Sequence, residues 1–314
     1  MNLQQLRYLN EIVRRDLKIS DAADALFTSQ PAISKQIKLL EEELGIQIFQ
    51  RNGKRIAALT EPGKGLLAIA QRMLIDAENF KQFAQEFHSK DTGHLTIATT
   101  HTQARYALPP VVKQFIERYP KVKLGLHQGT PTQIAEQVLH GDADICIATE
   151  SLSLYDGLVT LPCYEWHHCV VVPPRHPLLK EKTLTLSSIA QYPIITYDHA
   201  FSGRGKIDDA FEKSGITPDI ALTAIDADVI KTYVELGLGI GILAEIAFIP
   251  ERDRHLRMIP ARHLFKPSTT RIAIRKNEYL RGYTYDFIEL FAPHLTHEVV
   301  ARAMHLSNLP AKQY

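Results

Sequence analysis

Apolar residues recur at helical spacing near the start of the chain and predict three helices there. A first helix is indicated by the apolar positions Leu3, Leu6, Leu9, Ile12 and Val13. A short alanine-rich helix, Asp21–Leu26, is expected to follow, with Ser20 as its N-cap. The third helix is expected to begin after the N-cap Ser29 and to end at Gly45, which suits a left-handed C-cap. Its buried stripe is predicted to be Ile33, Ile37, Leu40 and Leu44.

The opposite face of the third helix is small, polar and basic. Pro31 and Ser34 lie on it with Lys35 and Lys38, and Gln30 stands at its tip. Such a face suits the DNA major groove, where Gln and Ser can read base edges and lysines can meet phosphates. An ordinary amphipathic surface helix would show the same pattern. The preceding short helix and tight turn complete a helix-turn-helix and favour DNA binding.

A basic hairpin is predicted directly after this helix. Asn52-Gly53 separates two short β runs, which is a strong hairpin signal, and basic residues surround it. A basic hairpin is usually only a solvated loop, but after a helix-turn-helix it is better explained as a wing that meets the phosphate backbone. The residues predicted to contact DNA are therefore Ser29, Gln30, Pro31, Ser34, Lys35, Lys38, Arg51, Lys54 and Arg55.

A long helix is predicted from Glu61 to about His88. Its apolar positions alternate steps of four and three, which is a heptad pattern. These positions are Leu66, Ala70, Met73, Ala77, Phe80, Ala84 and Phe87. Seams of this length also occur inside helical bundles, but a seam on a helix between domains favours a dimer interface. Dimers suit DNA binding because two-fold proteins read paired half-sites.

From about residue 91 the chain alternates strands and helices, which predicts parallel sheets covered by helices and an α/β fold. The run Leu158–Pro173 is expected to be one long strand. We predict a winged helix-turn-helix at 1–60, a linker helix at 61–90 and an effector-binding domain at 91–314. The last is expected to form two periplasmic-binding-protein-like subdomains, about 91–164 with 266–314, and 165–265, with a ligand crevice between them.

Composition narrows the function. The 314 residues carry a formal charge of only +1, so DNA contact must come from a local basic patch. No secretory signal and no apolar run long enough to cross a membrane are apparent, so a cytoplasmic protein is expected. The three cysteines, Cys146, Cys163 and Cys169, show no CxxC spacing and argue against a disulfide framework or a metal site. We expect no resident cofactor.

The sequence also allows two other functions, a thiol redox sensor and an enzyme or solute receptor. A thiol redox sensor would use Cys163 and Cys169, but on one strand these would lie roughly 20 Å apart, too far to bridge. An enzyme or a free-standing solute receptor could share the two-lobed domain. No nucleophile elbow, P-loop, dinucleotide fingerprint or HExxH motif supports an enzyme, so no catalytic residue is predicted.

The chain resembles the LysR-type transcriptional regulators. The resemblance rests on Ala22-Ala23, on Ser29 to Ser34, on Leu44-Gly45 and on Phe49-Gln50-Arg51. The remainder resembles the CysB-like branch of that family, which regulates sulfur assimilation. The runs that carry this second resemblance are 97–109, 115–120, 131–135, 226–233 and 291–296.

The resemblance implies a homotetramer, dimerised through the linker helix, that binds a double-stranded DNA operator and controls genes of sulfur assimilation and cysteine biosynthesis. RNA polymerase is considered as a further partner. The implied effectors are an acetylserine-type inducer and sulfur anions such as sulfate or thiosulfate; a relative devoted to sulfonates is the alternative. The implied anion pocket is Thr100, Thr102, Gln103, Thr149, Trp166 and Ser202, the last standing where the family has Thr.

The chemistry of these residues suits an anion. Thr100 to Gln103 end a strand and open a helix, where hydroxyls and free backbone N–H groups converge. Thr149 ends the next inward strand, and Ser202 opens a helix of the other subdomain. Serine and threonine are also the commonest helix caps, so the same residues could be purely structural. Whether Arg204 pairs with the ligand or points to water is left open.

Overall fold

The computed structural model describes residues 1–53 and 55–306, without the side chains of Ser202 and Leu306. The predicted DNA-contacting residue Lys54 therefore lies outside the described residues. The chain divides into two compact units, one formed by Met1–His88 with Asn277–Tyr279 and the other by Ser89–Lys276 with the chain from Leu280 onward. No helix in the described part of the chain is both long enough and apolar enough to cross a membrane.

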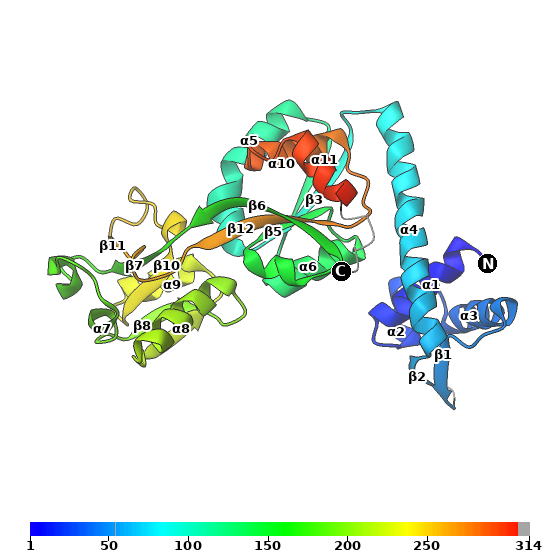
Figure 1. Ribbon diagram of the computed structural model, residues 1–314, viewed down its shortest axis with the longest axis horizontal. Helices are drawn as coiled ribbons and strands as arrows, with labels where there is room; N and C mark the ends of the chain where they lie inside the picture. The colour runs from blue at the N-terminus through cyan, green and yellow to red at the C-terminus, as the bar shows by residue number, and fades with distance from the viewer. Residues whose placement is uncertain (54, 307–314) are drawn as a thin grey trace. The chain divides into compact units, whose positions relative to one another are not determined.

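The first unit is a winged helix-turn-helix followed by a long helix (Figure 1). Its elements are α1 (Leu3–Arg14), α2 (Ile19–Ala25), α3 (Gln30–Leu44), β1 (Phe49–Asn52), β2 (Arg55–Leu59) and α4 (Glu61–His88). The core of this unit joins the apolar faces of α1, α2 and α3 with Ile48 and Phe49. In the antiparallel pair β1–β2, Asn52 pairs with Arg55 and Gly53 lies in the turn, which confirms the predicted hairpin.

Two local predictions for this unit were wrong. Helix α2 begins at Ile19, and its N-cap is Lys18, without a side-chain cap. Asp16 and Leu17 both have positive φ (51° and 64°), so the chain turns earlier than the Ser20 cap pattern predicted. Leu44 was expected in the buried stripe of α3 but is 38% exposed, since the helix ends there and the chain turns away.

Helix α4 uses its heptad positions in two ways. Ala70 is buried in the core of the first unit, and Leu66 and Met73 pack against that core. Further along the helix, Phe80 and Phe87 are each 77% exposed. The predicted seam is therefore intramolecular in its first half, while its second half offers an apolar face to solvent.

The second unit contains two five-stranded sheets, one for each subdomain (Figure 1). The first has the order β4-β3-β5-β12-β6. Its strands are β3 (Gly93–Thr99), β4 (Val122–Gln128), β5 (Ile145–Ala148), β6 (Leu158–Trp166) and β12 (Ser268–Arg275). The second has the order β11-β7-β10-β8-β9. Its strands are β7 (His168–Val172), β8 (Ile194–Tyr197), β9 (Ile220–Ala224), β10 (Ile240–Ala244) and β11 (Arg257–Pro260).

Helices pack on these sheets. The first subdomain has α5 (Leu108–Arg118), α6 (Pro131–His140), α10 (Gly282–Phe291) and α11 (His297–Leu306). The second has α7 (Leu186–Ile189), α8 (Ser202–Ser214) and α9 (Ala227–Glu235). Short helices fill the connections, namely the π-helix η1 (Gln103–Ala107) and the 3-10 helices η2 (Glu150–Leu154), η3 (Pro177–Lys180) and η4 (Glu245–Ala247).

Each sheet is mixed, not parallel as expected. Strand β3 pairs parallel with β4 and β5, and β8 pairs parallel with β9 and β10. The strands adjoining the two crossings between the subdomains, β6, β12, β7 and β11, pair antiparallel with their neighbours. These strands run in the opposite direction because the chain leaves one sheet through them and later returns to it from the other sheet.

The run Leu158–Pro173 is two strands and not one. It leaves the first sheet at Trp166, passes through His167 and enters the second sheet at His168. The break follows because each sheet has its own core, so a single apolar run serves two cores in succession. The chain returns between β11 and β12, and Ser268 pairs with Trp166 at this crossing.

Candidate DNA-binding surface and effector cavity

Helix α3 has the geometry that the sequence predicted. The Ser29 hydroxyl accepts a hydrogen bond from the backbone N–H of Ala32 (3.4 Å), and Gly45 closes the helix with a left-handed backbone (φ 66°). Ile33, Ile37 and Leu40 are at most 1% exposed, which fixes the helix against the core. The opposite face therefore stays available to a partner.

The predicted DNA-contacting residues lie at the start and along the outer face of α3 and on the wing strands β1 and β2. Ser34 is half-buried, and the others in the described part of the chain are exposed, namely Ser29, Gln30, Pro31, Lys35, Lys38, Arg51 and Arg55. Two cations already have carboxylate neighbours: Lys38 Nζ lies 3.5 Å from Glu42, and Arg51 lies 3.4 Å from Glu41. Contact with DNA at these positions stays a prediction.

Glu41 fixes the wing to the recognition helix. One of its carboxylate oxygens accepts from the backbone N–H groups of Ile48 (2.9 Å) and Phe49 (3.2 Å), and the other faces Arg51. This pairing joins α3 to the strand β1. The Arg51 guanidinium therefore supports the wing in the free protein, and a phosphate would have to compete with Glu41 for it.

A cavity of about 40 Å³ lies between the subdomains of the second unit. Its wall contains five of the six residues of the predicted anion pocket, namely Thr100, Thr102, Gln103, Thr149 and Trp166. The side chain of the sixth, Ser202, lies outside the described part, but its neighbours Phe201 and Gly203 line the cavity. The structure thus brings together residues that are far apart in the sequence, while their role in binding stays a prediction.

Several helices begin at this cavity. Lining residues stand at or beside the starts of η1 (Thr102), α6 (Pro131), η2 (Thr149) and α8 (Gly203). The starts of η1, η2 and α8 have no side-chain cap. The helix starts that lack a side-chain cap thus border one space, and the positive end of a helix dipole favours an anion.

Two polar atoms of the cavity wall have no hydrogen-bond partner among the described residues. These are the hydroxyl of Thr149 and the indole nitrogen of Trp166, and both atoms are buried. An indole N–H can only donate, and a buried unpaired polar group costs about 1–3 kcal/mol. The wall therefore offers unpaired polar groups that suit a ligand with hydrogen-bond acceptors.

Gln103 is already engaged by the protein. Its amide nitrogen donates to the Thr270 hydroxyl (3.2 Å), and its carbonyl oxygen accepts from the Tyr164 hydroxyl (2.5 Å). The side chain is 3% exposed. These bonds fix the amide orientation and leave one N–H of Gln103 to meet a ligand.

Arg204 neither lines the cavity nor points to water, the two roles that the sequence left open. It is 4% exposed, and it donates to Asp208 (2.7 Å) and to the backbone carbonyl of Tyr197 (2.9 Å). It is absent from the cavity wall, and none of the described lining side chains carries a formal charge. Arg204 instead fixes the start of α8 to the end of β8.

The cavity wall also contains residues that the sequence did not reveal. These are Pro131, Tyr197, Phe201, Gly203 and Ala244. A side chain at position 203 would be crowded, because a Cβ there would lie 3.1 Å from the Trp166 ring and 3.3 Å from His168 Nε2. The position of Tyr197 at the end of a buried strand could have been recognised, but the close approach at Gly203 depends on the tertiary structure.

Comparison with known proteins identifies the family. The bacterial regulatory helix-turn-helix domain of the lysR family matches residues 3–64, and the LysR substrate binding domain matches residues 88–296. The chain belongs to the LysR family of transcriptional regulators. The α/β fold with a helix-turn-helix and a two-sheet effector-binding domain is thereby confirmed, and the family is one of regulators, not of enzymes.

This LysR-type regulator is similar along nearly its whole length to two regulators of Burkholderia cenocepacia. It is 56% identical to SsuR over 301 residues, which are 96% of this chain and 98% of that protein. It is 54% identical to CysB over 304 residues, which are 97% of each. The cofactor-binding domain of the Cbl transcriptional regulator superposes with a TM-score of 0.66 at 47% identity, covering 68% of this chain and 93% of that one. The resemblance to the CysB-like branch is confirmed.

The thiols of this regulator are buried and unpaired. Cys163 lies in the core of the first subdomain and Cys169 in that of the second. The two residues are therefore not on one strand, and the distance argument built on a single strand was wrong. The thiols are nevertheless free, as expected. Burial raises the pKa of Cys163 to about 12 and raises the pKa of Cys169 as well. Such thiols are poor nucleophiles, which argues against redox sensing.

Proposed function

We propose that this LysR-type regulator senses a small sulfur oxyanion and controls genes for sulfur assimilation and cysteine biosynthesis. The observation that supports this proposal best is the uncharged cavity with unpaired donors at Thr149 and Trp166, where helix N-termini converge. Neutral donors can bind an anion reversibly, as a sensor requires. Thr100, Thr102, Gln103 and Ser202 would supply the remaining hydrogen bonds.

The size of the cavity favours a compact ligand. A water molecule needs roughly 10–15 Å³ in the same measure, so about 40 Å³ holds about three waters or a small tetrahedral ion. Sulfate and thiosulfate suit this space, whereas a nucleotide-linked sulfate is far too large for it. An acetylserine-type inducer would require the subdomains to separate or would bind elsewhere.

Oligomerisation completes the proposal. The exposed Phe80, Phe83 and Phe87 of α4 would pack against a second copy and place two recognition helices on paired half-sites. We infer a homotetramer acting in the cytoplasm, with RNA polymerase as a further partner. Gln30, Pro31 and Ser34 would meet bases, and Lys35, Lys38, Arg51, Lys54 and Arg55 would meet phosphates.

A sulfonate-responsive regulator is the second candidate. The identities to SsuR (56%) and CysB (54%) are nearly equal and do not decide between control by sulfonate and by sulfate. Ser202 bears on this choice, because serine keeps a hydroxyl but lacks the methyl group of the threonine that the family pattern has there. Loss of that methyl group would leave more room for a carbon substituent on the anion.

DNA footprinting with effector tests the proposal. The full chain would be bound to a candidate operator and titrated with sulfate, thiosulfate, an alkylsulfonate or O-acetylserine, with chloride as the control. We expect one of these compounds to change the footprint length or the DNA bend, because only a ligand with different affinity for two assembled states can shift their balance. An unchanged footprint at saturating sulfate, thiosulfate and alkylsulfonate would refute the proposal, even if O-acetylserine changed it.

A further inference from the structure

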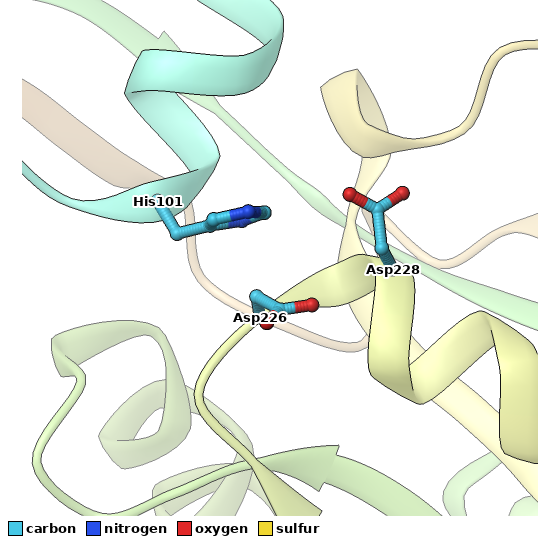
Figure 2. Close-up of side chains that lie close together, drawn as sticks. All are labelled: His101, Asp226 and Asp228. Atoms are coloured by element: carbon cyan, nitrogen blue, oxygen red, sulfur yellow. The ribbon is translucent and has the colours of Figure 1, made fainter. Parts of the chain in front are cut away.

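The helix η1 and the start of α9 face one another across the boundary between the two subdomains. From η1 and the residues before it come His101, Arg105 and Tyr106, which carry donors, and from α9 come Asp226 and Asp228, which carry acceptors (Figure 2 shows His101 and the two aspartates). The ligating atoms of His101, Asp226 and Asp228 all lie within 4.8 Å of one another. Polar groups of both subdomains thus meet at this boundary.

Asp228 is the centre of this contact. One carboxylate oxygen accepts from Arg105 Nε (2.8 Å), and the other accepts from the Tyr106 hydroxyl (2.7 Å). Burial alone would raise the pKa of Asp228, but the Tyr106 hydrogen bond and the charges of Lys231 and Arg105 outweigh it and lower the pKa. The carboxylate is therefore charged and fully paired across the boundary.

A buried lysine extends the contact into the second subdomain. Lys231 is 6% exposed, and its ammonium donates to the Tyr106 hydroxyl (3.1 Å), to the Ala247 carbonyl (2.9 Å) and to Asp253 (3.0 Å). The Tyr106 ring packs against the apolar core that contains Ala247. One side chain of the first subdomain is thus held by hydrogen bonds and by packing inside the second.

The same short helix serves the effector cavity. Thr102 and Gln103 line the cavity, while His101, Arg105 and Tyr106 face α9. The π-helical turn over Gln103–Ala107 has i→i+5 hydrogen bonds, and such turns are rare and frequent at functional sites. A shift of η1 relative to α9 would therefore move two cavity residues together.

A metal ion explains this cluster less well than a protein contact does. Asp228 already faces two cations, with Arg105 at 2.8 Å and Lys231 at 3.4 Å, and an oxygen of Asp226 accepts from the Val229 backbone N–H (2.8 Å). A divalent cation would have to compete with these partners. The charges thus favour contact between the subdomains.

We propose that Arg105 and Tyr106 of the first subdomain and Asp228 and Lys231 of the second form a latch that holds the subdomains together and sets the effector affinity of the cavity. This inference rests on the proposed function, because it assigns a control element to the same cavity. Cavity residues come from both subdomains, so an effector is fully held only while the latch is closed. Tyr106 and Asp228 act as positioning residues for Thr102 and Gln103.

Two conservative variants test the latch in the full chain. Tyr106→Phe keeps the packed ring and removes only the hydroxyl, and Asp228→Asn keeps the shape and removes the charge. Each should raise the Kd for sulfate about tenfold by calorimetry, the size expected for one lost hydrogen bond to a charged group. The double variant should cost less than the product of the two single effects, because both remove the same contact.

A matched control breaks an ion pair inside one subdomain. Arg302→Gln removes the hydrogen bond from Arg302 to Glu298 (2.6 Å) within α11 and should leave the sulfate Kd unchanged. Hydrogen exchange without effector supplies a second readout, and the amides of residues 102–107 should exchange faster in both latch variants. Unchanged Kd and unchanged exchange would overturn the latch. If the unaltered chain binds no sulfate, the proposed effector is wrong, and exchange alone decides the latch.

Discussion

Replacing Thr149 by valine separates the binding role of the cavity from its structural role. Thr149→Val keeps the shape of the side chain and removes a buried hydroxyl that has no partner among the described residues. A hydrogen bond to a charged group contributes about 1.5–3 kcal/mol, so the Kd for an oxyanion should rise about 10- to 150-fold. We expect this loss for every anion that the cavity binds.

The stability of the empty protein should not fall in Thr149→Val. Removing an unpaired buried hydroxyl costs no protein hydrogen bond, so the free energy of unfolding should stay unchanged or rise by up to about 1 kcal/mol. Thr196→Val is the matched control, because the Thr196 hydroxyl is buried and donates to the Ile242 carbonyl (2.8 Å). The control should lose about 1 kcal/mol of stability without a change in Kd.

Titration calorimetry with sulfate and thiosulfate would give the Kd values, and chemical denaturation without ligand would give the stabilities. If Thr149→Val binds the anions as tightly as the unaltered chain, the Thr149 hydroxyl does not contact the ligand. If Thr149→Val destabilises the empty protein as much as Thr196→Val does, the Thr149 hydroxyl has a structural partner and is not reserved for a ligand.

Three further outcomes are expected. In salt titrations of DNA binding, Lys38→Ala should weaken binding to all sequences and reduce the salt slope by about one, whereas Gln30→Ala should mainly relax sequence choice; equal losses would contradict this division. Cys163→Ser with Cys169→Ser should leave the oxidant response of operator binding unchanged. Burial lowers the pKa of His168 to about 4. As pH falls from about 6.5 to about 4, this histidine therefore takes up a proton in the unfolded chain before it does so in the folded one, and the free energy of unfolding drops by about 3 kcal/mol. His168→Phe should flatten that drop in pH-dependent denaturation.

The DNA-binding unit was predictable because its signals are local. The cap at Ser29, the left-handed Gly45 and the turn at Asn52 each act within a few residues. The start of α2 was missed because positive φ angles at Asp16 and Leu17 overrode the cap pattern. The two uses of α4 were not separable, since an apolar helix face does not show which partner covers it.

The effector domain was predictable only in part. The pocket residues came from the family resemblance, and the threonines at strand ends only suited them to an anion. The split of Leu158–Pro173 was missed because a continuous apolar run does not show where a chain passes from one core to another. The contact of Tyr106 with Asp228 joins residues 122 positions apart, and no local pattern predicts it.

Fluorescence of Trp166 would show whether the cavity binds a sulfur oxyanion. Trp166 is the single tryptophan of the chain and lies in the cavity wall, so its emission reports on this site alone. The full chain would be titrated with sulfate, thiosulfate and an alkylsulfonate, at constant ionic strength with chloride. We predict a saturable change with at least one sulfur oxyanion that is strongly weakened in Thr149→Val. A Trp166 signal that responds to none of them beyond chloride would mean that the cavity binds no sulfur oxyanion.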